Sequence, residues 1–80
     1  MLRSDYVQKV ISEICRECVQ TSHYQSMCKA IIDENYTMQR HYLEVFRDMV
    51  YLKLENYELS EWERGVVYEE AQYEVCKILY

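Results

Sequence analysis

The chain has 80 residues, a formal net charge of −5, no proline and only one glycine. Its length gives a single domain, residues 1–80, and the scarcity of proline and glycine disfavours sheet-rich folds, which need many tight turns. The negative charge disfavours direct binding of DNA or RNA and of an anionic membrane surface, because both usually require a basic protein face.

Apolar residues recur at helical spacing along the chain and predict four helices, at about residues 5–20, 23–34, 38–55 and 61–79. We therefore expect an all-α fold, either a small four-helix bundle or an orthogonal helical array. The carboxyl-terminal turn is apolar up to its last residue, and nine tyrosines suit half-buried and interface positions. These two features motivate a second hypothesis, in which a homodimer completes the bundle.

Polar residues at the expected helix ends set the boundaries. Ser4 is a suitable cap for the first helix, and Ser22 with Gln25 has capping-box spacing for the second. Asn35 is expected to end the second helix, because asparagine tolerates the left-handed backbone conformation, and Thr37 is expected to cap the third.

The clearest start signal is Ser60-Glu61-Trp62-Glu63, a capping box that also places two acids next to the positive end of the helix dipole. The helix that follows has two apolar sides. One side carries Val67, Tyr68, Ala71, Val75, Ile78 and Leu79, and a neighbouring side carries Trp62, Val66, Tyr73 and Tyr80. Gly65 lies in the first turns, where either the close approach of another backbone or simple tolerance would explain it.

The net charge is concentrated in the second half of the chain. Between Glu55 and Glu74 there are seven glutamates and one opposing base, Arg64. We interpret the start of the fourth helix as an acidic, aromatic surface for a partner protein with a basic face. The candidate binding residues are Tyr57, Glu58, Glu61, Trp62 and Glu63. The simpler interpretation is that Trp62 fills the core.

Cys15, Cys18, His23 and Cys28 form the pattern C-x2-C-x4-H-x4-C. This segment resembles the zinc knuckle of retroviral nucleocapsid proteins, and the resemblance implies four ligands for a tetrahedral zinc ion. The glycines that let a knuckle turn around its ion are replaced here by residues 19–22. The cysteines also continue the apolar stripes of two helices, so core packing as free thiols is the favoured interpretation. A zinc-stabilised binding module is the alternative.

A second resemblance begins at Tyr57-Glu58-Leu59-Ser60. This stretch and four later residues are similar to part of the Hha/YmoA family, small helical bacterial proteins that bind and modulate nucleoid-associated repressors. The four later residues are Glu63, Val66, Tyr68 and Ala71. The family continues with Asp-His-Arg where this chain has Gln72-Tyr73-Glu74. Because the aspartate that binds the family's partner is glutamine here, we do not transfer the family's function.

Sequence motifs for catalysis are lacking. The sequence has no nucleophile elbow and no glycine-rich phosphate loop, so we expect neither an enzyme nor a cofactor. It has no apolar run of transmembrane length and no signal-peptide core, which predicts a cytoplasmic location. We expect a non-enzymatic interaction module, such as an adaptor, an inhibitor or a regulatory subunit. The alternative from another class is an acidic inhibitor that mimics nucleic acid, with its glutamates spaced along one face.

Overall fold

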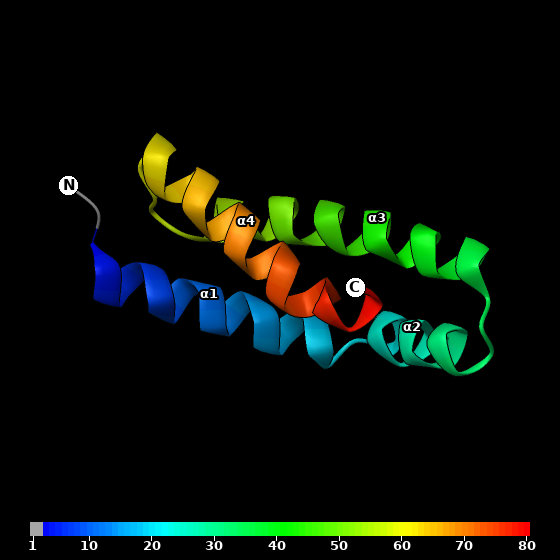
Figure 1. Ribbon diagram of the computed structural model, residues 1–80. Coiled ribbons are helices and arrows are strands. Elements are labelled where there is room, and N and C mark those ends of the chain that lie inside the picture. Colours follow the sequence, from blue (N-terminus) through cyan, green and yellow to red (C-terminus); the bar gives the residue numbers. More distant parts are fainter. Residues whose placement is uncertain (1–2) are drawn as a thin grey trace.

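The computed structural model describes residues 3–80, which form four α-helices and two short 3-10 helices (Figure 1). The α-helices are α1 (Ser4–Val19), α2 (Ser22–Ile32), α3 (Tyr36–Lys53) and α4 (Glu61–Cys76). The 3-10 helices η1 (Leu54–Asn56) and η2 (Lys77–Leu79) continue α3 and α4. No strand occurs in this part of the chain, so the all-α prediction is confirmed. Across the same residues, no helix is long and apolar enough to cross a membrane.

α1 and α3 run antiparallel along the length of the molecule, and α4 packs across both of them (Figure 1). α2 is the shortest α-helix among residues 3–80 and lies at the end where α1 finishes and α3 begins. The molecule is accordingly elongated, with extents of 44 × 18 × 18 Å. Because α4 contacts α1 and α3 with one side, its other side faces away from these two helices.

One hydrophobic core joins the four helices. Phe46 of α3 is fully buried in it, and its ring meets that of Tyr24 of α2 edge-on, with centroids 6.1 Å apart. The buried residues of α1 and α4 follow the spacing of three and four residues that their apolar stripes predict. The core residues are Val7, Val10, Ile11, Ile14, Cys18, Met27, Phe46, Val50, Leu54, Val67, Ala71, Val75 and Cys76.

The first two helices start one residue earlier than predicted. α1 begins at Ser4 itself, so this serine is not its cap. α2 begins at Ser22, and its cap is Thr21, whose hydroxyl accepts a hydrogen bond from the Tyr24 amide at 3.3 Å. Thr21 keeps the extended backbone of a cap residue, whereas Ser22 is already helical. The predicted capping box of Ser22 with Gln25 is therefore wrong.

The junction between α2 and α3 is also shifted. Asn35 caps α3, and its side-chain oxygen accepts a hydrogen bond from the Met38 amide at 3.1 Å. Its backbone amide also donates to the Ala30 carbonyl in the last turn of α2, at 2.8 Å. The left-handed backbone conformation falls on Glu34, whose φ is 54°. Thr37 lies inside α3, because asparagine is at least as good an N-cap as threonine and stands two residues earlier.

Candidate functional site

α4 begins at a fully formed capping box. The Ser60 hydroxyl accepts a hydrogen bond from the Glu63 amide at 3.2 Å, and the Glu63 carboxylate accepts one from the Ser60 amide at 2.9 Å. The two bonds satisfy backbone donors that the start of a helix otherwise leaves free. The predicted start of this helix is confirmed. The position of the first turn fixes the directions in which the side chains that follow point.

Trp62 lies in the first turn of α4 and is 72% exposed. The buried residues Val67, Ala71 and Val75 mark the side of α4 that faces the core. Because successive residues of an α-helix are rotated by about 100°, Trp62 projects from nearly the opposite side. The indole therefore faces solvent, and the interpretation of Trp62 as a core residue is wrong.

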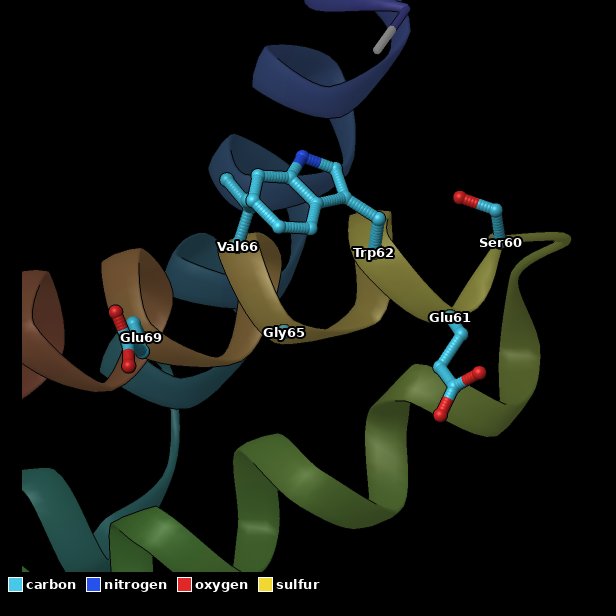
Figure 2. Close-up of a pocket in the computed structure, with 6 residues that line it drawn as sticks. All are labelled: Ser60, Glu61, Trp62, Gly65, Val66 and Glu69. Carbon is cyan, nitrogen blue, oxygen red and sulfur yellow. The ribbon is translucent and has the colours of Figure 1, made fainter. Parts of the chain in front are cut away.

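An open hollow runs along the solvent side of α4. Figure 2 shows the Trp62 indole beside Val66, one turn further on, with Gly65 bare at the helix surface. A Cβ atom placed on Gly65 would meet no other atom within 4 Å, so nothing in the described residues crowds this position. The hollow is lined by Ser60, Glu61, Trp62, Gly65, Val66 and Glu69.

Aromatic rings continue this side of α4 to the carboxyl end. Tyr73 lies eleven residues after Trp62, about three helical turns, and therefore points the same way. Its ring stacks on that of Tyr80, with centroids 5.9 Å apart and planes 12° apart, and both side chains are exposed. We define the outer face of α4 as Trp62, Gly65, Val66, Glu69 and Tyr73.

The bases closest in sequence to the outer face of α4 are engaged with other carboxylates. Arg64 pairs with Glu55 at 3.1 Å. Lys77 pairs with Glu74 at 2.9 Å. Four nearby glutamates form no salt bridge with residues 3–80: Glu58, Glu61, Glu69 and Glu70. Arg47 of α3 lines a neighbouring hollow with Glu69 and Tyr73 and forms no salt bridge with residues 3–80. Because the unpaired carboxylates outnumber this base, the charge around the outer face of α4 is net negative.

Glu63 is a buried residue that links the start of α4 to the start of α1. It is 1% exposed, and its carboxylate accepts two hydrogen bonds from the Arg3 side chain, at 2.8 Å from Nη2 and 2.9 Å from Nε. These bonds, together with that from the Ser60 amide, hold the pKa of Glu63 well below its ordinary value of 4.5. The bidentate ion pair joins the start of α4 to the start of α1. Glu63 is therefore buried in this ion pair and does not belong to the exposed candidate surface.

Tyr57 is half-buried in the segment between η1 and α4. Its hydroxyl donates a hydrogen bond to Glu17 of α1 at 3.4 Å, and Lys53 pairs with the same carboxylate at 3.2 Å. Burial and then the charge of Glu17 raise the pKa of Tyr57 to about 12. Tyr57 thus ties the segment after α3 to α1. Of the five predicted binding residues, Glu58, Glu61 and Trp62 remain exposed.

In the described part of the chain, the residues of the zinc-like pattern are not gathered into a metal site. Among residues 3–80, no three His, Cys, Asp or Glu side chains are placed to hold a metal ion. Cys18 is buried in the core, and Cys15 Sγ donates a hydrogen bond to the Ala71 carbonyl at 3.8 Å. His23 is exposed, with its ring 6.3 Å from that of Tyr42. The zinc-stabilised module is therefore not supported.

The buried thiols should resist alkylation in the native protein. Burial raises the pKa of both Cys18 and Cys76 to about 11, so neither forms an appreciable amount of thiolate near neutral pH. We expect iodoacetamide to label Cys28, which is only half-buried on α2, well before these two. Peptide mass spectrometry of native and urea-unfolded protein measures the order of labelling. Early labelling of Cys18 in the native protein would contradict its burial.

Most of the outer face of α4 lies beyond residues 57–63, which contain the binding residues predicted from the sequence. Val66 and Tyr73 share a helix side with Trp62, a relation visible in the sequence as spacings of four and seven residues. Gly65 and Glu69 join this side by spacings of three and seven from Trp62. The candidate site therefore follows the surface of one helix and not the consecutive residues 57–63.

Comparisons with known proteins identify no relative of this chain. No family model matches the sequence, and no curated protein or solved structure matches it either. A small all-α fold does not by itself select a function, because similar arrangements of helices serve many functions. The functional assignment therefore depends on the outer face of α4.

Proposed function

We propose that the chain is a non-enzymatic protein interaction module that binds a partner protein through the outer face of α4. The observation that carries the proposal is the exposure of Trp62 beside an open hollow that the described residues leave unfilled. A large aromatic ring that stays exposed does not stabilise the fold by the free energy that its burial would provide. Tryptophan is also among the residues that most often dominate binding when they enter a partner's pocket. An adaptor, an inhibitor or a regulatory subunit would work in this way.

The charge around the outer face of α4 supports a partner with a basic surface. Glu61 and Glu69 line the hollow itself, and neither forms a salt bridge with a base of residues 3–80. Charges at the rim of an interface accelerate the encounter with an oppositely charged partner and set its register. The aromatic residues then supply most of the affinity.

The cysteines support a cytoplasmic location for the module. Cys15, Cys18, Cys28 and Cys76 are all free thiols. Free thiols persist in reducing compartments, whereas secreted domains of this size commonly rely on disulfides. We therefore place the proposed interaction in the cytoplasm.

Nucleic-acid mimicry is less well supported as a function. A mimic needs free carboxylates spaced along one face, in place of phosphates. Three of the seven glutamates between residues 55 and 74 are instead neutralised by ion pairs. The pairs are Glu55–Arg64, Glu63–Arg3 and Glu74–Lys77. We therefore favour the interaction module.

Matched surface variants test the proposed function. Tyr36 is 73% exposed at the start of α3, at the opposite end of the molecule from the start of α4 (Figure 1). We expect wild type and Tyr36→Ala to capture the same partner from cells that express the protein, and Trp62→Ala to lose it. Circular dichroism should show that all three are equally folded. Equal capture by Trp62→Ala and wild type would overturn the proposal.

A further inference from the structure

The outer face of α4 carries its apolar residues in one line along the helix. Trp62, Val66 and Tyr73 lie in one line over eleven residues, which at about 1.5 Å per residue spans about 16 Å. A helix laid along this line presents its own apolar residues at matching spacings. Gly65 lies beside this line, and a Cβ atom placed on it would have no other atom within 4 Å. A partner can therefore approach the α4 backbone closely at this position.

The charges along this line indicate the charge that a partner should carry. Glu61 and Glu69 line the hollow, and Glu70 is exposed beside them. None of the three forms a salt bridge with the described residues. An apolar line bordered by unpaired carboxylates is complemented by an apolar stripe bordered by lysine or arginine. The matching element is a basic amphipathic helix.

A second copy of this chain fits the surface less well. A two-fold contact through the outer face of α4 would bring two identical acidic surfaces together, each with Glu61, Glu69 and Glu70. Like charges across an interface oppose association. The same repulsion disfavours a nucleic acid, whose phosphates are also negative. A partner of opposite charge avoids this repulsion.

We infer that the outer face of α4 binds a basic amphipathic helix of the partner protein. The apolar stripe of that helix lies on Trp62, Val66 and Tyr73. Its lysines or arginines face Glu61 and Glu69. The inference rests on the proposed function and adds the chemical class of the partner. In this arrangement the aromatic residues supply the affinity, and the glutamates govern the association rate and its dependence on salt.

Synthetic peptides test this inference. The probe is a peptide of about 18 residues, five helical turns, with leucines on one side and lysines bordering them. One control peptide keeps the leucines and replaces the lysines with glutamates, and a second has the residues of the probe in scrambled order. The emission of Trp62, the only tryptophan, reports binding. We expect a saturable blue shift with the probe and none with either control.

Variants of the chain locate the binding site. By calorimetry, Trp62→Ala should weaken binding of the probe by at least about tenfold. Glu61→Gln with Glu69→Gln should weaken it at low salt and reduce its salt dependence. The matched control is Glu44→Gln with Asp48→Asn, which removes two exposed carboxylates from α3. This control should leave both the affinity and the salt dependence unchanged.

Gly65→Ala distinguishes binding from folding. Alanine favours a helix over glycine and would meet no atom of the described chain, so the thermal midpoint of the free protein should rise. The added methyl group occupies the space that a partner helix would use, so affinity for the probe should fall. A rise in the midpoint with unchanged affinity would contradict the close approach of a partner at this position.

Three kinds of result would overturn the inference. The first is a control peptide that binds as tightly as the probe, or a Trp62→Ala variant that binds the probe unchanged. The second is self-association that Trp62→Ala abolishes, which would make a second copy the occupant. The third is a partner captured through Trp62 that binds by a segment other than a basic helix. In that last case the proposed function stands and the inference alone fails.

Discussion

Replacing Glu63 with alanine is expected to cost more stability than replacing any other charged residue in the described chain. The substitution removes the hydrogen-bond acceptor of the Arg3 side chain and of the Ser60 amide in one step. It leaves that amide without a partner and releases the start of α4 from the start of α1. Urea unfolding followed by circular dichroism should show a lower midpoint with an unchanged slope.

Ser60→Ala is the matched control, because it removes only the other bond of the capping box. The Ser60 hydroxyl accepts a hydrogen bond from the Glu63 amide at 3.2 Å. Its loss should cost about 1 kcal/mol, a typical value for an N-cap. If Glu63→Ala were no more destabilising than Ser60→Ala, the ion pair with Arg3 would contribute nothing to the fold.

Acid should weaken the same ion pair. The hydrogen bonds from Arg3 lower the pKa of Glu63 in the folded chain below its ordinary value of 4.5, so its carboxylate stabilises the fold fully above pH 4.5. This stabilisation is lost as the pH falls toward the lowered pKa. The difference in stability between wild type and Glu63→Gln should therefore shrink below pH 4.5. A difference that stays constant across this range would contradict the ion pair.

Phe46→Ala is expected to have the largest effect within the core. The side chain is fully buried and packs edge-on against Tyr24. Truncating a buried phenylalanine costs about 3–5 kcal/mol, a large part of the roughly 5–15 kcal/mol that stabilises a small domain. Thermal unfolding should therefore show a much lower midpoint or a partly unfolded chain.

Leu52→Ala provides the control for Phe46 on the same helix. Leu52 is 67% exposed on α3, so its truncation creates no cavity. The change in stability should lie within about 0.5 kcal/mol of zero. Equal melting of the Phe46→Ala and Leu52→Ala variants would contradict the position of Phe46 in the core.

The helices can be predicted from the sequence because their signals are local. Apolar residues three and four apart determine which side of α1 and α4 is buried, and the capping box at Ser60 determines where α4 begins. Helix ends are harder to predict, because one residue type suits several cap positions. Asn35 is suited both to end a helix and to begin one, and only the packed chain shows that it begins α3.

The candidate site can be predicted only in part from the sequence, because two of the predicted binding residues form hydrogen bonds with residues that are distant in the sequence. Glu63 bonds to Arg3, 60 residues earlier, and Tyr57 bonds to Glu17, 40 residues earlier. No local pattern reveals pairs so far apart in the sequence. The exposure of Trp62 likewise depends on which side of α4 packs against α1 and α3.

The fluorescence of Trp62 tests its exposure, and with it the proposed binding face, most directly. Because this is the only tryptophan, its emission reports a single position. We predict a red-shifted emission in the isolated protein that acrylamide quenches readily. Caesium should quench it more strongly than iodide, because Glu61 and Glu69 attract cations and repel anions. A blue-shifted emission that none of these quenchers reaches would show a buried indole and contradict the proposed binding face.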